Sequence, residues 1–297
     1  MRPFKNIIIH KFNEPFKLTE EQFTTAIAEY PLRECLEQEV VSFGWLPAFS
    51  QGENFVEKMN NAYFIRLGMN IKKLSRKAIA TEVERRAREH GIDLLDRARY
   101  KELEETVTQV FIKKAYPEQS SMMAYIDLEK GWLVVDAATE KKSSLLTAVL
   151  RKSLDSLPVV GYAPQVDMPT IMTDWVKQGH INDSFGLLDE VEMKELNKDE
   201  GGTARYKGIP LDSKEIELNL EEGWSVTRVG LSHEDIVTFS LGQDFIFKRL
   251  RYLDQFQEKL ELSDDQNAVA QSNAYLLADT VRSLATGLFN ACYDNND

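Results

Sequence analysis

The segment from about residue 71 to 116 constrains the fold most, because its composition favours helix over any other structure. It contains a single glycine, Gly91, lacks proline and is dense in residues with high helix propensity. Ile79 and Val83 are four residues apart, a spacing that places both on one helical face. We expect two helices that meet near His90 and Gly91, because glycine commonly follows the last turn of a helix. The segment therefore predicts a helical arm, 71–116, within a larger protein.

Charge is segregated along the chain. The arm has twelve basic and eight acidic residues, a net charge of +4, whereas the whole chain carries −12, so the remainder carries −16. An acidic protein can still bind nucleic acid if its positive charge is concentrated on one surface. The arm therefore supplies twelve candidate DNA-binding residues: Lys72, Lys73, Arg76, Lys77, Arg85, Arg86, Arg88, Arg97, Arg99, Lys101, Lys113 and Lys114.

These basic residues also have an ordinary explanation. Arginine, glutamate and lysine that alternate along a helix usually form a solvated face held by salt bridges. The clusters Arg85–Arg86 and Arg97–Arg99 favour DNA. Few aromatic residues lie between the basic ones, which argues against a single-strand stacking platform. No helix-turn-helix, zinc-finger or RNA-recognition signature is present, so nothing supports sequence-specific recognition.

The segments on either side of the arm predict strands and packed helices. Phe4–Phe12 and Ala62–Met69 have strand composition, and Thr19 begins a capping box ahead of a helix. We expect a turn at Gly44–Pro47. The strands 122–127 and 132–136 form a hairpin around Glu129–Gly131, and a helix follows over 140–154.

The last part of the chain predicts a second unit. Strands are expected at 222–229 and 236–241, and helices at 248–260 and 269–292. We predict an α+β fold with mixed β-sheets, packed helices and a protruding helical arm. Its expected units are a central domain (1–70 and 117–165), the arm (71–116) and a base domain (166–297).

Catalytic signatures are absent, so we do not expect an enzyme, a cofactor or a bound metal. The phosphate-loop, nucleophile-elbow and zinc-protease motifs do not occur. The best enzymatic alternative is a metal-dependent exonuclease that uses Asp127 and Asp136, with Lys141 or Lys142 beside the phosphate. More commonly, such aspartates end strands and bind turn backbone groups.

The chain has the composition of a soluble protein of a reducing compartment. No apolar run approaches the roughly 20 residues that span a membrane. Cys35 and Cys292 are far apart in sequence and fit no metal-binding spacing. We expect a cytoplasmic protein with no membrane partner.

Several stretches resemble the bacterial recombination-associated proteins of the RdgC family. They follow the family order over nearly the whole chain, and the region 122–160 is the most specific. The matching stretches are Phe4–Asn6, Gly44–Pro47, Ser121–Met123, Ile126–Asp127, Val135–Asp136, Leu150–Leu154, Ser156–Val160, Phe185, Leu187–Glu190 and Lys248–Leu250.

The resemblance implies a ring-shaped homodimer whose basic central hole takes double-stranded DNA. It further implies binding with little sequence preference, restraint of RecA-promoted strand exchange, and a place in the nucleoid. Family members are sometimes labelled exonucleases. A ring would reconcile the charge pattern, because an acidic exterior can coexist with a basic lumen.

The resemblance also suggests roles for three residues outside the charge analysis. Tyr116 follows Lys113–Ala115 at the position where the family has a phenylalanine at a ring-closing contact between subunits. The ordinary alternative is a helix-end aromatic that covers local core. Arg205 and Lys207 match a second basic stretch that contacts DNA, although Gly208–Ile209 stand where the family has lysine and glutamine.

Overall fold

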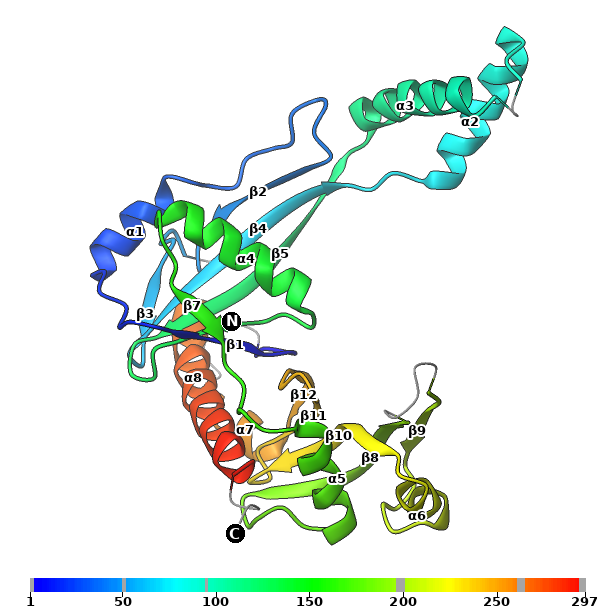
Figure 1. Ribbon diagram of the computed structural model, residues 1–297. Coiled ribbons are helices and arrows are strands. Elements are labelled where there is room, and N and C mark those ends of the chain that lie inside the picture. The colour runs from blue at the N-terminus through cyan, green and yellow to red at the C-terminus, as the bar shows by residue number, and fades with distance from the viewer. Residues whose placement is uncertain (1–2, 50–51, 94–95, 196–200, 261–264, 294–297) are drawn as a thin grey trace.

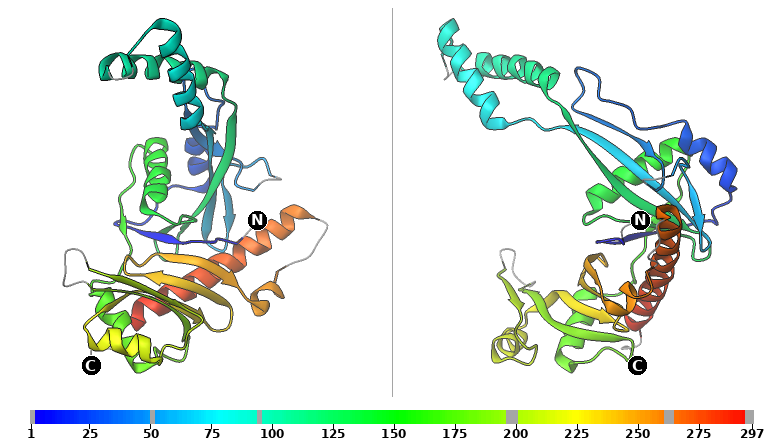
Figure 2. Two further views of the ribbon diagram at one scale, coloured as in Figure 1. Left: turned by 90° about the vertical axis from the view of Figure 1, so that its right-hand side faces the viewer. Right: turned by 180° about the vertical axis from the view of Figure 1, so that it is seen from behind.

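Two antiparallel β-sheets joined by helices form the body of the protein, and a helical arm extends from one end (Figure 1). The computed structural model describes residues 3–49, 52–93, 96–195, 201–260 and 265–293. Figures 1 and 2 show an elongated, curved molecule with the arm at one end and the second sheet at the other. The expected α+β class is confirmed, and every pair of neighbouring strands named below is antiparallel.

The first sheet has the strand order β2-β4-β5-β6-β1-β7, with β3 beside β4. Its long central pair, β4 and β5, continues toward the arm, and both strands are longer than the sequence predicted. The strands are β1 (Ile8–Phe12), β2 (Val41–Leu46), β3 (Glu57–Met59), β4 (Ala62–Lys72), β5 (Pro117–Asp127), β6 (Trp132–Val135) and β7 (Val159–Gly161).

Apolar side chains cover both faces of this sheet. Tyr63 and Ile65 share a core with residues of α1 (Glu20–Ala28) and α4 (Glu140–Ser153). Phe64 alternates with them along β4 and therefore joins the core on the opposite face. The capping box at Thr19, the 129–131 turn and the helix after it are confirmed.

The expected turn at Gly44–Pro47 is wrong, because Gly44, Trp45 and Leu46 lie inside β2. Glycine is required there for another reason: a Cβ at position 44 would lie 2.4 Å from the backbone of Pro31 and Leu32. Beside this close approach, Trp45 donates its indole N–H to Ser153 at 2.8 Å. Two of the stretches that carry the family resemblance, Gly44–Pro47 and Leu150–Leu154, therefore meet in the core between the first sheet and helices α1 and α4.

The second sheet has the strand order β12-β11-β10-β8-β9. Helices α5 (Met168–Gln178) and α8 (Gln266–Ala291) pack against one of its faces. The strands are β8 (Phe185–Lys194), β9 (Thr203–Lys207), β10 (Ser225–His233), β11 (Val237–Gly242) and β12 (Phe247–Tyr252), and the short helices are α6 (Lys214–Glu221) and α7 (Asp254–Gln257).

The helix expected over 248–260 is wrong in its first half. Phe247–Tyr252 pairs with β11 as an edge strand, and within 248–260 the only assigned helix is the four-residue α7. The helix expected over 269–292 is confirmed as α8. It is longer than predicted because Asp265 caps its N-terminus through the backbone N–H groups of Asn267 and Ala268.

Helix α8 joins the two sheets through one continuous core. Leu277 and Leu284 lie in the same apolar cluster as Phe64 of the first sheet and Phe247 of the second. That cluster crosses the expected boundary at residue 165, so the first and second sheets share buried surface. The division into central and base domains stays a prediction.

The two arm helices form where the sequence predicted them. Ser75 caps α2 (Arg76–His90), Asp96 caps α3 (Arg97–Lys114), and Gly91 adopts φ +62° after α2. The arm has a small core of its own that includes the buried residues Ile79 and Val83. The arm is therefore a helical hairpin with little buried surface, attached to the ends of β4 and β5 (Figure 1).

Candidate nucleic-acid interface

Acidic neighbours pair with several of the arm's basic side chains. Arg85 and Arg86 both donate to Glu82, at 2.7 and 2.8 Å, and these hydrogen bonds lower the pKa of Glu82 to about 2. This part of the arm matches the ordinary explanation of a solvated face held by ion pairs. The remaining paired residues are Lys73 with Glu118, Arg88 with Glu84 and Arg99 with Asp96; Arg85 also contacts Glu89.

Another six basic residues of the arm are exposed, and among the described residues none of them has an ion-pair partner. They are distributed along both helices, from the first turn of α2 to the last turn of α3. Their charge is therefore available to an anionic partner. These residues are Arg76, Lys77, Arg97, Lys101, Lys113 and Lys114.

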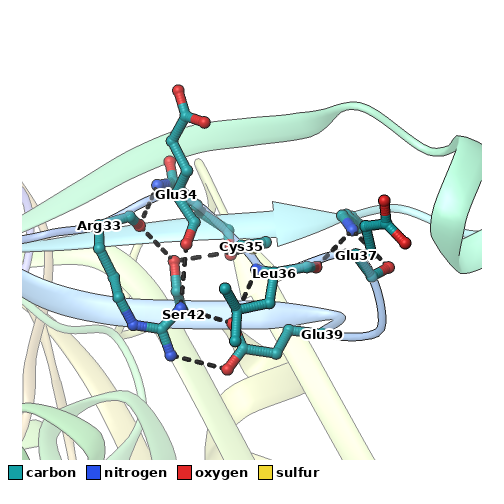
Figure 3. Close-up of polar contacts among 9 residues, drawn as sticks. Arg33, Glu34, Cys35, Leu36, Glu37, Glu39 and Ser42 are labelled. Carbon is teal, nitrogen blue, oxygen red and sulfur yellow. Dashed lines mark hydrogen bonds and ion pairs between the residues drawn. The ribbon is translucent and has the colours of Figure 1, made fainter.

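Unlike these six residues, Lys72 is not exposed, which corrects its prediction as a DNA-binding residue. Its side chain is buried, and its ammonium donates to the carbonyls of Leu36 and Glu37 at 2.9 and 3.0 Å; Figure 3 labels both residues. Burial of an ammonium is costly unless it is hydrogen-bonded. Lys72 therefore fixes the loop before β2 to the end of β4, and its charge is not presented to solvent.

The rest of this loop is held by a polar network (Figure 3). Arg33 forms a two-pronged ion pair with Glu39, at 2.6 and 2.7 Å. The carbonyl of Arg33 accepts hydrogen bonds from Ser42 of β2 and Asn70 of β4. The loop thus supports one side of the strands that lead to the arm.

Tyr116 lies between α3 and β5 and is 92 % exposed. The alternative of a helix-end aromatic covering local core is therefore wrong. A tyrosine ring normally removes a large apolar surface from water when it is buried. Its exposure leaves this ring available to another molecule.

Basic side chains also gather on the face of the second sheet opposite α5 and α8. Both candidates from the base segment, Arg205 and Lys207, are on this face. They are joined there by residues from two other strands. We call this surface the basic sheet face and define it by Arg205, Lys207, Arg228, Lys248, Arg249 and Arg251.

The pairing of β12 with β11 assigns Lys248 and Arg251 to this face. Lys248 lies opposite Ser240 and Arg251 opposite Thr238, whereas Phe239, between Ser240 and Thr238, points into the core. The left view of Figure 2, taken from the open side of the curved molecule, has the strands of the second sheet in front of α8. The basic sheet face therefore looks toward the concave side of the molecule.

Two carboxylates lie among these cations, and a third, Asp244, pairs with Lys248 at 3.7 Å. Glu192 is 7 % exposed and accepts from Arg205 at 2.7 Å and Arg228 at 3.4 Å, while the more exposed Glu190 pairs with Arg249. Burial opposes ionisation of Glu192, but the hydrogen bond from Arg205 and the charge of Arg228 outweigh it, so its pKa lies below the ordinary value. With six cations and three carboxylates, the face keeps an excess of positive charge.

Sequence reasoning missed four residues of the basic sheet face: Arg228, Lys248, Arg249 and Arg251. A signal existed in the run 247–252, where buried Phe247 and Leu250 are interleaved with basic residues. A helix over this run would spread those basic residues around its surface. As an edge strand, the run presents them to one side of the sheet.

The candidate nuclease residue Asp127 has a structural role. It is fully buried, contacts Arg282 of α8 at 2.9 Å, and accepts hydrogen bonds from the backbone N–H groups of Glu129 and Lys130. These contacts are those of a strand-ending aspartate whose carboxylate is satisfied by a turn and a cation. The carboxylate is therefore not open to a metal ion or a phosphate.

The structure does not bring Asp136 together with Asp127. Asp136 accepts hydrogen bonds from the backbone N–H groups of Lys5 and Asn6, and its own N–H bonds to Met123. Since Met123 precedes Asp127 by four residues of β5, the two aspartates lie at opposite ends of the hairpin, about 13 Å apart along the strand. Lys141 and Lys142 are exposed in the first turn of α4.

Within the described ranges, no cluster of three or more His, Cys, Asp and Glu side chains could hold a metal ion. His10 accepts from or donates to Ser143 at 2.6 Å, but Ser143 is fully buried and cannot attack a bound substrate. None of the described helices is long and apolar enough to cross a membrane.

Comparison with known proteins gives a match over almost the whole chain. The model of the family described as "Putative exonuclease, RdgC" matches residues 3–294. A protein named "Recombination-associated protein RdgC" from Pseudomonas syringae pv. tomato is 30 % identical over 279 residues, which cover 91 % of this chain and 90 % of that protein.

Two further relatives carry the same name. That of Pseudoalteromonas translucida is 28 % identical over 305 aligned residues, 99 % of each chain. That of Salmonella paratyphi B is 28 % identical over 296 residues, with 96 % of this chain and 97 % of the relative covered. The similarity therefore extends through the arm, both sheets and α8.

Proposed function

Because this chain belongs to the RdgC family of recombination-associated proteins, we propose that it binds double-stranded DNA without sequence preference. The basic sheet face is the central part of the binding surface. The six exposed, unpaired basic residues of the arm extend this surface. The protein acts as a nucleoid-associated DNA-binding protein of the cytoplasm and not as an enzyme.

One observation carries this proposal: a chain of net charge −12 gathers six cations on one uncovered sheet face. Positive charge collected on a concave surface raises the local potential far above what the net charge suggests. Lysine and arginine contact phosphates, which are the same at every step of a duplex. Binding through this surface is therefore independent of sequence.

The curved shape and the exposed Tyr116 support a closed homodimer. Two curved subunits that meet at both ends enclose a central hole, and Tyr116 provides an aromatic anchor for one of the two contacts. A ring around the duplex would cover the DNA that RecA-promoted strand exchange must reach. The proposed biological effect is restraint of RecA-dependent recombination.

The function is tested by fluorescence anisotropy with labelled linear duplexes of unrelated sequence over a range of salt concentrations. We expect similar affinities for all sequences, and a linear fall of log affinity with log salt at a slope of about −0.9 per phosphate contacted. A flat salt dependence, or a strong preference for one sequence, contradicts the proposal. Gels with and without Mg²⁺ test the exonuclease alternative, which requires shortened DNA products.

Replacing Tyr116 with alanine is expected to weaken the homodimer by about tenfold or more, because exposed aromatic anchors dominate many interfaces. The free energy of unfolding of the subunit should change by less than about 0.5 kcal/mol, since the ring buries no local surface. Sedimentation velocity and urea denaturation measure the two quantities.

The matched control is Tyr275→Ala, which removes a 55 % exposed tyrosine from α8. It should leave the oligomeric state unchanged. A Tyr116→Ala protein that dimerises as tightly as the parent would place the subunit contact elsewhere.

A further inference from the structure

A cavity of about 270 Å³ opens on the basic sheet face where β8, β9, β10 and β12 come together. It is lined by four cations and two carboxylates: Arg205, Lys207, Arg228, Arg249, Glu190 and Glu192. The sheet pairing fixes the order of these groups, because Glu190 lies opposite Lys207 and Glu192 opposite Arg205. The cavity has a net charge of +2 and is open to solvent, which suits a singly charged anion.

The two carboxylates have different surroundings. Glu192 is buried and holds Arg205 and Arg228 in place. The side chain of Glu190 is 27 % exposed, and it pairs with Arg249, whose side chain is 51 % exposed. Glu190 can therefore leave its partner for solvent at much lower cost than Glu192.

Arginine donors remain unused in the cavity. Within the described part of the chain, the Nε–H of Arg228 is buried and has no hydrogen-bond partner. A buried donor without an acceptor is unfavourable, and such groups mark positions where a ligand or a water supplies the missing bond. Lys207 adds a fourth cation, and it forms no ion pair with any described residue.

We propose that this cavity is a subsite for one backbone phosphodiester of DNA, in which Glu190 occupies the guanidinium of Arg249 until the phosphate displaces it. Glu192 is a positioning residue that keeps Arg205 and Arg228 oriented. The exchange replaces one carboxylate by one phosphate oxygen, so no covalent bond changes. This subsite rests on the proposed DNA-binding function and specifies where one phosphate is held.

Glu190→Gln tests the subsite because it removes the competing charge and keeps the size of the side chain. We expect about fivefold tighter binding of a 20-base-pair duplex. The slope of log affinity against log salt should change little, because the same phosphate contacts Arg249 in the parent and in the variant. The added substitution Arg249→Gln should abolish the gain in affinity. Circular dichroism and urea denaturation verify that each variant folds.

The matched control is Asp189→Asn, which removes the same charge one residue away in β8. Its side chain points to the other side of the strand and does not line the cavity. We expect a smaller gain in affinity and an unchanged salt slope. Equal effects of Glu190→Gln and Asp189→Asn overturn the subsite but leave DNA binding by the parent protein intact. A parent protein that fails to bind duplex DNA at low salt overturns both proposals.

Discussion

Replacing Arg205, Lys207 and Arg251 with glutamine should weaken duplex binding by on the order of a hundredfold to a thousandfold at low salt. These residues come from both edges of the second sheet, and their side chains are exposed. Each neutralised contact should also reduce the salt slope by about 0.9. Fluorescence anisotropy with one duplex at four or more salt concentrations measures both effects.

A matched variant separates a local surface from the effect of net charge. Lys17, before α1, and Lys177, on α5, are exposed, and Lys130, in the β5–β6 turn, is partly exposed; all three lie outside the basic sheet face. Their replacement by glutamine removes the same three charges. The affinity should fall by less than about tenfold. If the two triple variants lose affinity equally, the basic sheet face is not the binding surface.

Replacing Arg282 with methionine should lower the free energy of unfolding by about 3 to 5 kcal/mol. The substitution leaves the fully buried carboxylate of Asp127 without its cation, and it also removes a hydrogen bond to the carbonyl of Asn60. An uncompensated buried charge is among the most destabilising changes in a protein. Urea denaturation followed by circular dichroism measures the loss.

Two further variants identify the cause of that loss. Glu129→Gln removes an exposed carboxylate 3.6 Å from Arg282 and should cost less than about 1 kcal/mol. The double variant Asp127→Asn with Arg282→Met removes both charges and should recover part of the stability. A single Arg282→Met variant as stable as the parent would show that this ion pair does not hold α8 to the first sheet.

Local signals in the sequence were sufficient for most of the helices. Ser75 and Gly91 delimit α2, and Thr19 begins α1, through side-chain and backbone preferences that act within a few residues. The segments that were predicted wrongly depend on partners distant in sequence. Gly44 faces the chain at Pro31 and Leu32, and 247–252 becomes a strand because β11 pairs with it.

The candidate surface was predictable only in part for the same reason. Charge counting along the chain found the arm, but it could not tell that Arg85 is engaged by Glu82 or that Lys72 is buried. The basic sheet face combines residues from β9, β10 and β12, which are separated by up to about fifty positions in the sequence. Only the strand order of the second sheet brings them together.

The hydrogen bonds around Lys72 have a geometric consequence for assembly. They join the loop at Leu36 and Glu37 to the strand that ends at the arm, so the direction in which the arm leaves the body is set when the chain folds. In the proposed closed pair of subunits, that direction would determine the diameter of the enclosed space. Lys72, which the sequence analysis predicted to bind DNA, would thus help to set the width of the space that accommodates the duplex.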